Sequence, residues 1–211
     1  MSALISIPAA YLLGSIPFSW IVARLYGIPD IRRAGSGNPG ATNVWRTAGP
    51  VAGLMAFAGD IAKGVAAILV GRALLTRFGS AELSADALLV LTGLAAVLGH
   101  IFTIFLSFRG GKGVAAGLGV MITLLPIPTL VALAAFGIVA GLTRIVSLGS
   151  MLAGMVLAAV VVVQRFVLDQ RVALVYVWMT VILAALVLWT HRQNIVRLVH
   201  GRENRFKAGG S

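Results

Sequence analysis

Residues 113–143 read GVAAGLGVMITLLPIPTLVALAAFGIVAGLT, and this uncharged stretch decides which folds the chain can adopt. One helix over all 31 residues would be about 46 Å long, whereas the hydrocarbon core of a bilayer is ~30 Å thick. Pro126 and Pro128 lie near the middle, and each proline removes a helix hydrogen bond and disfavours helix at the preceding residue. The stretch therefore predicts a hairpin of two shorter helices rather than one straight pass.

Further stretches carry almost no charge and are long enough to cross a bilayer, at about 20 apolar residues per helix. They are residues 1–23, 47–71, 87–108, 146–164 and 172–190. The first lacks the basic start of a signal peptide, so we expect it to remain as a span. Backbone amides find no water inside lipid, and the stretches lack the alternating polar positions of barrel strands. Together they predict an all-α integral membrane protein with about seven transmembrane helices, in a single membrane-embedded domain of residues 1–211.

The composition excludes a water-soluble surface and most metal sites. Of the 211 residues, 59% are apolar and 11% charged, and the mean hydropathy is +1.00, whereas soluble domains carry about 25% charged residues. The net charge of +11 would suggest nucleic-acid binding in a soluble protein, but cations gather in the cytoplasmic loops of membrane proteins whatever their function. Because cysteine is absent and the three histidines are scattered, we expect no disulfide and no metal site. We also expect no cofactor and no nucleic-acid partner.

The basic residues between the stretches predict the orientation of the chain. An external N-terminus puts Arg72, Arg77, Arg165 and Arg171 outside and leaves Lys63 within a span. The other twelve cations are then inside: Arg24, Arg32, Arg33, Arg46, Arg109, Lys112, Arg144, Arg192, Arg197, Arg202, Arg205 and Lys207. This asymmetry predicts an external N-terminus and a cytoplasmic C-terminus, and it favours the hairpin, because a single pass would put Arg144 outside.

One polar segment reads GSGNPGATNVWR from Gly35 to Arg46. Its Gly-x-Gly-x-x-Gly opening does not indicate a dinucleotide site, because a transmembrane stretch takes the place of the required strand. Three glycines can turn successive amides inward as an anion-binding nest, and a helix starting near Ala41 would add its positive end. Arg46 suits bidentate phosphate contact, and further donors are Ser36, Thr42 and Asn43. The alternative is an ordinary glycine-rich turn.

Two other segments share the predicted cytoplasmic face. Residues 109–113, RGGKG, lack the spacing of a nucleotide-binding P-loop, but glycines around Lys112 let a phosphate approach the backbone; the alternative is a cationic cap between helices. Residues 191–207, HRQNIVRLVHGRENRFK, have the apolar spacing of a short amphipathic helix at the membrane surface; the alternative is a tail that binds anionic lipid. Glu203 suggests an orienting ion pair or a hydrogen bond to a substrate hydroxyl.

Ionisable residues also lie within the predicted spans. Asp60 and Lys63 are spaced i, i+3, so each can lower the other's cost of burial. A structural ion pair and a functional role are equally compatible with this spacing. His100 fits a packed, hydrogen-bonded histidine or a catalytic one, and the roles of all three residues stay open.

The order of these segments resembles the bacterial acyl-phosphate:glycerol-3-phosphate acyltransferase family, PlsY. The matching stretches are residues 35–46, 110–114 and 191–203, with LLGS at 12–15 and LGH at 98–100 as weaker matches. The resemblance implies transfer of a fatty acyl group from acyl phosphate to the 1-hydroxyl of sn-glycerol 3-phosphate, giving lysophosphatidate and phosphate, the first acylation of phospholipid biosynthesis. It implies a bacterial plasma (inner) membrane protein whose cytoplasmic active site is formed near residues 31–46, 107–113, 144–147 and 191–207.

Site roles follow from this resemblance as hypotheses. Acyl phosphate would be bound by Ser36, Gly37, Asn38, Thr42, Asn43, Gly110, Gly111 and Lys112. Glycerol 3-phosphate would be bound by Arg46, Lys112, Ser147, His191, Asn194 and Glu203. The residues expected to take part in catalysis are Ser36, Asn38, Arg46, Lys112 and His191. The expected partners are these two substrates and the lipid bilayer, and we expect a monomer.

The general base remains open in the sequence. The His-x-x-x-x-Asp motif of another glycerolipid acyltransferase family is absent, because the three histidines are followed at that offset by Phe105, Val196 and Arg205. A phosphate of the substrate is the favoured base, with His191 or His100 as alternatives. Two other functions are considered: an organophosphate or lipid-precursor transporter, which would place its polar residues at midplane, and a purely structural membrane subunit.

Overall fold

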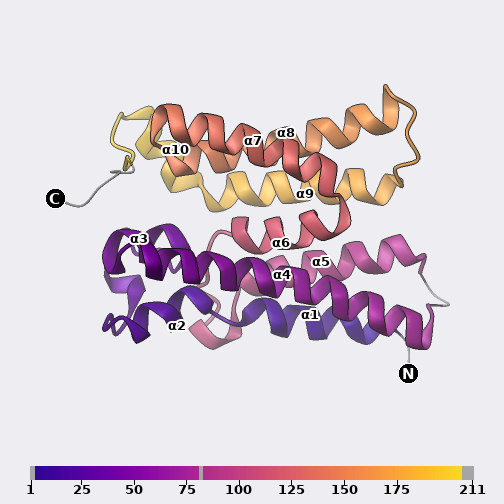
Figure 1. Ribbon diagram of the computed structural model, residues 1–211, viewed down its shortest axis with the longest axis horizontal. Coiled ribbons are helices and arrows are strands. Elements are labelled where there is room, and N and C mark those ends of the chain that lie inside the picture. Colours follow the sequence, from indigo (N-terminus) through magenta and orange to yellow (C-terminus); the bar gives the residue numbers. More distant parts are fainter. Residues whose placement is uncertain (1–2, 81–82, 206–211) are drawn as a thin grey trace. The chain divides into compact units, whose positions relative to one another are not determined.

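The computed structural model describes residues 3–80 and 83–205, and all regular secondary structure in these ranges is helical (Figure 1). The α-helices are α1 Ser6–Ser15, α2 Phe18–Leu25, α3 Ala41–Ala48, α4 Pro50–Phe78, α5 Ala85–Ile101, α6 Val114–Leu124, α7 Pro126–Thr143, α8 Val146–Phe166, α9 Leu174–Thr190 and α10 Arg192–Val199. Short 3₁₀ turns are η1 Ala3–Ile5, η2 Ile31–Arg33 and η3 Ile104–Leu106. The predicted all-α class is confirmed. Lys207, assigned to the last polar segment, lies outside the described residues.

The chain divides into two compact units, unit 1 of Met1–Leu124 and unit 2 of Leu125–Ser211. Unit 1 contains α1 to α6, with α4 packed against α1, α2, α3, α5 and α6. In unit 2, α8 packs between α7 and α9, and α10 follows α9 at a bend of 59°. The single domain of residues 1–211 stays a prediction.

The proline-containing stretch breaks where the sequence predicts. Leu125 has φ −134° and ψ 72°, outside the helical region, and it separates α6 from α7. Pro126 occupies the first turn of α7, where its missing N–H has no helical partner to lose. The break into two helices is confirmed, whereas their arrangement as a hairpin stays a prediction.

Most of the described helices are long and apolar enough to cross a membrane. Five qualify by length and composition, and the bent pair of α9 and α10 gives a sixth. α6 has 11 residues, about 16 Å, which is too short for a full crossing. The protein is therefore a multi-pass membrane protein, and length alone accounts for up to six of the seven predicted spans.

The first span is broken at Pro17, and this break shapes the interior of unit 1. α1 ends at Ser15 and α2 begins at Phe18, so carbonyl groups near the break lose their helical donors. Thr103 donates its hydroxyl to the Ser15 carbonyl at 2.5 Å, and Lys63 donates its ammonium to the Ile16 carbonyl at 2.8 Å. Lipid offers no hydrogen bonds to a broken helix, so these side chains make the break tolerable.

Glycines set the closest helix contacts of unit 1. A methyl group at Gly99 of α5 would lie 2.2 Å from the Tyr11 carbonyl oxygen of α1, and one at Gly64 of α4 would lie 2.3 Å from the Ala116 carbonyl oxygen of α6. Both obstacles are backbone atoms, which cannot rotate away. Small residues let helix backbones approach closely in membranes, so these positions fix how α1, α4, α5 and α6 pack.

We expect Gly99→Ala to lower the free energy of unfolding by about 1–3 kcal/mol, because the added methyl group forces α1 away from α5. Gly117→Ala is the matched control, since the nearest atom to its methyl group would be 4.0 Å away and alanine favours helix. Thermal unfolding in detergent measures both variants. Equal unfolding temperatures for the two would contradict the assigned close packing.

Candidate functional site

The loop from Gly35 to Gly40 leads into α3. Gly35 and Gly37 have φ values of 57° and 73°, in the left-handed region that glycine adopts without strain. α3 begins at Ala41, as the sequence predicts, after an extended Gly40. The loop therefore lies at the positive end of a helix.

Asn43 closes this loop from inside. Its amide oxygen accepts from the Ser36 N–H at 2.8 Å, while its amide nitrogen donates to the carbonyls of Ile31 at 3.2 Å and Ala34 at 2.9 Å. The side chain is 2% exposed. Both amide hydrogens of Asn43 thus have protein acceptors. The side chain holds the loop in shape, whereas from the sequence we expected it to bind the phosphate of the substrate.

The donors that face outward are fewer than the sequence suggests. The backbone amides of Ser36, Gly37 and Gly40 donate within the protein, to Asn43 Oδ1 and to the carbonyls of Ala34 and Asn38, so the predicted nest of successive inward-pointing amides is wrong at these three. The Ser36 side chain is exposed, and those of Asn38 and Thr42 are partly exposed. Asn38 folds over Gly40, where a methyl group would lie 2.7 Å from its amide nitrogen. These side chains, rather than the amides at 36, 37 and 40, are the loop's candidate donors.

The second loop lies against the end of α5. Gly110 donates its N–H to the Ile101 carbonyl at 2.9 Å, and Gly111 donates to the His100 carbonyl at 3.1 Å. A side chain at Gly110 would lie 2.0 Å from the His100 carbonyl oxygen, so only glycine fits this close approach. Lys112 follows directly, half-buried, before Val114 starts α6.

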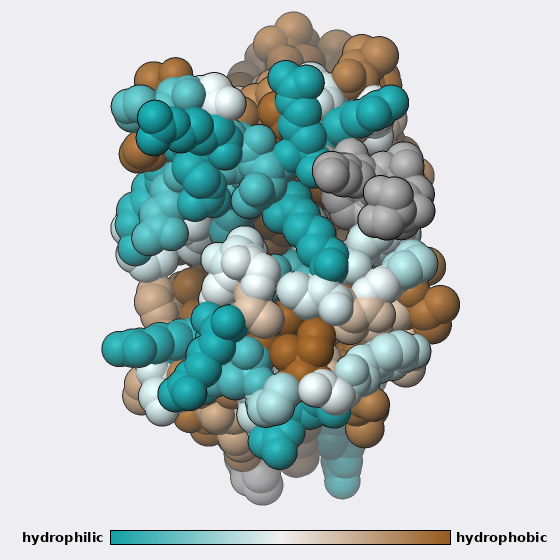
Figure 2. Space-filling view, turned by 90° about the vertical axis from the view of Figure 1, so that its left-hand side faces the viewer, coloured by the Kyte–Doolittle hydropathy of each residue, from teal (hydrophilic) through white to brown (hydrophobic). Residues whose placement is uncertain are grey.

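An arginine connects the two loops. The Arg32 guanidinium pairs with Asp30 at 2.8 Å and donates to the Leu106 carbonyl at 3.3 Å. The hydrogen bonds from Arg32 lower the pKa of Asp30 to about 2, so this carboxylate is ionised at neutral pH. Arg46, in the last turn of α3, belongs to the same unit and is exposed. Hydrophilic side chains gather on the face of the molecule shown in Figure 2.

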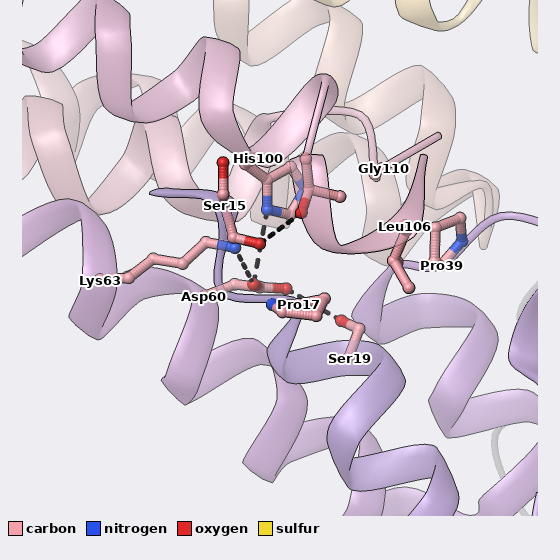
Figure 3. A pocket seen from close by; sticks show the side chains of 11 residues that line it. Ser15, Pro17, Ser19, Pro39, Asp60, Lys63, His100, Leu106 and Gly110 are labelled. Carbon is pink, nitrogen blue, oxygen red and sulfur yellow. Dashed lines mark hydrogen bonds and ion pairs between the residues drawn. The ribbon is translucent and has the colours of Figure 1, made fainter. Parts of the chain in front are cut away.

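A buried ionic cluster lies below the second loop (Figure 3). Asp60 Oδ1 lies 2.7 Å from Lys63 Nζ and 3.4 Å from His100 Nδ1, and Asp60 Oδ2 accepts from the Ser19 hydroxyl at 2.9 Å. The exposed fractions of Asp60, Lys63 and His100 are 1%, 4% and 6%. The pairing of Asp60 with Lys63 is confirmed and His100 lies beside it, whereas the choice between a structural and a functional role stays open.

This cluster borders a cavity that reaches both loops. The cavity measures about 10 Å³, close to the space that one water molecule needs. It is lined by Ser15, Pro17, Ser19, Pro39, Asp60, Lys63, His100, Thr103, Leu106, Gly110 and Gly111. The buried charges therefore lie directly beneath the loops that carry the phosphate-binding candidates of unit 1.

The candidates of unit 2 converge on Glu203. Its Oε1 accepts from Ser147 at 2.8 Å and from Asn194 at 2.6 Å, and its Oε2 accepts from Arg197 at 2.7 Å. The Glu203 side chain is 4% exposed. The orienting ion pair considered for Glu203 is confirmed, and this cluster ties the segment after α10 to the start of α8.

His191 lies at the bend between α9 and α10. Its Nδ1 is 2.8 Å from the Val187 carbonyl oxygen, which can only accept, so we infer that Nδ1 carries a proton. The ring is buried. α10 itself confirms the predicted short helix, while its place at a membrane surface stays a prediction.

Glu203 makes the stability of unit 2 depend on pH. Burial raises the pKa of Glu203, but its three hydrogen bonds outweigh burial and hold the pKa below the ordinary value of 4.5. The carboxylate therefore stabilises the fold fully above the unfolded pKa, and this contribution disappears as the pH falls through the lower folded pKa. We expect the difference in unfolding temperature between the wild type and Glu203→Gln to be constant above pH of about 5 and to shrink in more acidic buffer. A difference that grows on acidification would contradict this.

The sequence-derived candidates thus fall into two groups. Unit 1 holds Ser36, Gly37, Asn38, Thr42, Asn43, Arg46, Gly110, Gly111 and Lys112, and unit 2 holds Ser147, His191, Asn194 and Glu203. Whether both groups bind one substrate stays a prediction. Ser15, Ser19 and Thr103 were not predicted as site residues. The signal that could have found them is Pro17, because a proline within a span requires side-chain donors nearby.

The comparisons with known proteins identify the family. The family described as glycerol-3-phosphate acyltransferase matches residues 4–201. This chain belongs to that family. A glycerol-3-phosphate acyltransferase of Geobacter sulfurreducens is 45% identical over 208 residues, covering 99% of this chain and all of the relative.

Solved structures of the family share this fold. A crystal structure of PlsY, an integral membrane glycerol 3-phosphate acyltransferase in its glycerol 3-phosphate form, has a TM-score of 0.83 and 39% identity, covering 97% of this chain and 96% of that one. The lysophosphatidic acid form of PlsY has a TM-score of 0.82 and 37% identity, over 97% and 95% of the two chains. The resemblance noted from the polar segments is thereby confirmed across almost the whole chain.

Proposed function

We propose that this chain transfers a fatty acyl group from acyl phosphate to the 1-hydroxyl of glycerol 3-phosphate, giving lysophosphatidate and inorganic phosphate. The observation that carries the proposal is the meeting of two glycine loops at one cavity of unit 1, where Pro39 of the first loop and Gly110 and Gly111 of the second are lining residues. Both substrates carry phosphate, so donors from two loops suit the reaction. The solved relatives, in glycerol 3-phosphate and lysophosphatidic acid forms, support the acceptor and the product.

In the proposed mechanism the loops of unit 1 hold the acyl phosphate. Ser36, Asn38 and Thr42 donate hydrogen bonds to its phosphate, and Lys112 balances the charge that develops on the departing group. Arg46 binds the phosphate of glycerol 3-phosphate. Asn194 and Glu203 of unit 2 are retained as proposed ligands of that substrate on the family resemblance alone. A substrate phosphate takes the hydroxyl proton, and His191 or His100 is the alternative acceptor.

Activity with defined donors tests this assignment. Purified protein in lipid is incubated with radiolabelled glycerol 3-phosphate and either acyl phosphate or acyl-CoA, and lysophosphatidate is measured. Product from acyl phosphate is expected. Product from acyl-CoA only would overturn the donor, and no product together with glycerol 3-phosphate counterflow in liposomes would favour a transporter.

The proposed topology has seven spans, an external N-terminus and a cytoplasmic active site in a bacterial inner membrane, in a protein that acts as a monomer. The cation asymmetry supports it, and the seventh crossing would combine α6 with the non-helical residues before it, because α6 alone is too short. Because the chain has no cysteine, single cysteines report their side unambiguously. An impermeant maleimide should label Ser84→Cys and Asp169→Cys in intact cells, but Arg33→Cys and Arg202→Cys only after permeabilisation. Labelling of Arg202→Cys in intact cells would reverse the second half of the topology.

A further inference from the structure

His100 stands between the buried carboxylate of Asp60 and the second glycine loop. Its Nδ1 faces Asp60 at 3.4 Å. Its opposite edge faces Gly111, where a methyl group would lie 2.3 Å from Nε2 and 3.0 Å from Cε1. The imidazole ring thus lies between the carboxylate and the loop backbone, beside the small cavity that all three border.

The lower side of the ring rests on a fixed support. Asp60 is held by Lys63 at 2.7 Å and by Ser19 at 2.9 Å, and Lys63 is held in turn by the Ile16 carbonyl. These groups come from α2, α4 and the break in the first span, so the carboxylate is tied directly to α2 and, through Lys63, to the break (Figure 3). A buried ion pair contributes little net stability compared with apolar packing, so its more informative feature is the geometry it fixes.

The upper side of the ring sets the position of the loop. Gly110 and Gly111 donate their amides to the carbonyls of Ile101 and His100, and the next residue is Lys112. These bonds tie the loop to the backbone of α5, and the ring edge lies against Gly111 on the other side. A shift of the ring toward the loop would therefore press on the backbone one residue before Lys112. A displacement of about 1 Å in a substrate-binding group can lower a rate about 100-fold.

We propose that His100, anchored by Asp60 and Lys63, is a positioning residue that sets the height of the Gly110–Lys112 loop above the interior of unit 1 and thereby aims Lys112 at substrate phosphate. This role rests on the proposed function of the loop. It assigns the buried charges to phosphate binding through the loop, without direct contact between His100 and substrate.

The first variant is His100→Asn, which keeps a polar group toward Asp60 and removes the ring edge toward Gly111. An asparagine amide reaches about as far as Nδ1 and can still face Asp60 Oδ1, but it lacks the Nε2 edge that lies against Gly111. We expect kcat/KM to fall about 10- to 100-fold, with a raised KM for acyl phosphate, while the unfolding temperature changes little. An unchanged kcat/KM per folded molecule would overturn the proposal, as would a loss that merely follows a lower unfolding temperature.

A double-mutant cycle tests the contact itself. Gly111→Ala should lower kcat/KM, because its methyl group meets the imidazole edge, and adding His100→Asn should restore part of the loss. Gly110→Ala is the matched control: its methyl group would meet the His100 carbonyl oxygen at 2.0 Å, which no side-chain change removes, so His100→Asn should not rescue it. Additive effects at Gly111, or equal rescue at both glycines, would overturn the proposal.

The same measurements separate this proposal from the function on which it rests. If the wild type forms no lysophosphatidate from either donor, the proposed function fails. If the wild type is active and the Gly111 cycle is additive, only the positioning role fails. Should Gly111→Ala fold poorly, the cycle is read in the unfolding temperature, where selective rescue by His100→Asn supports the contact and its absence overturns it.

Discussion

Arg46→Ala is expected to lower kcat/KM for glycerol 3-phosphate by about 30- to 1,000-fold, chiefly through a higher KM. Removing one partner of a charged, desolvated contact costs about 2–4 kcal/mol, and each 1.4 kcal/mol is a factor of ten. Arg46 lies in the last turn of α3, the helix whose first turn follows the Gly35–Gly40 loop, so its guanidinium comes from the same element that presents the loop. Steady-state kinetics with varied glycerol 3-phosphate measures the effect.

Two companion variants show whether the loss is specific. Arg46→Lys keeps the charge but not the planar fork that binds phosphate at two points, so an intermediate loss is expected. Arg33→Ala removes another exposed cation, from η2, and should change the kinetics only slightly, with an effect that salt screens. If Arg46→Ala and Arg33→Ala behaved alike, Arg46 would contribute only to the general positive field.

Lys63→Met is expected to have the largest effect on stability, lowering the free energy of unfolding by about 3–5 kcal/mol. The substitution leaves the Asp60 carboxylate buried without its cation and removes one of the two donors to the Ile16 carbonyl, which keeps the Phe18 N–H at 3.1 Å. Reversible unfolding in mixed micelles measures the change. Arg77→Met replaces an exposed cation near the end of the same helix and should stay within about 0.5 kcal/mol of the wild type.

The double variant Asp60→Asn with Lys63→Met separates stability from activity. Removing both charges avoids a lone buried ion, so stability should return to within about 1–2 kcal/mol of the wild type. Activity should stay low, because His100 has lost the carboxylate that anchors it. Recovery of both properties would show that the ion pair serves only the fold, and a double variant as unstable as Lys63→Met would contradict the pairing.

Local chemistry made several parts of the fold predictable. The break at Pro126 and the start of α3 at Ala41 follow from proline and glycine, whose backbone preferences act within one or two residues. Helix ends were less predictable: the span expected to end at Gly71 continues as α4 to Phe78. Charges such as Arg72 and Arg77 mark where a membrane ends, whereas a helix continues into water as long as its backbone bonds are satisfied.

The site was harder to predict, because it depends on side-chain direction and helix register. The sequence identified Asn43 as polar and near a phosphate loop, but an amide can donate to substrate or to its own loop, and the structure shows the second. It paired Asp60 with Lys63 from their spacing, yet His100 joins them only because close backbone contacts such as Gly64 with α6 and Gly99 with α1 set the register of α4 and α5. No local pattern encodes that register.

The boundary at Leu124 also has a consequence for how the protein is made. Chains are synthesised from the N-terminus and fold largely unit by unit, and unit 1 is compact by itself. Both glycine loops, Arg46 and the buried ion cluster belong to it, so the unit with these phosphate-binding candidates can assemble while the ribosome is still producing α7 to α10. A nascent chain arrested after Leu124 would already contain Asp60 together with Lys63 and His100, so the buried carboxylate would meet its cation before the second unit is made.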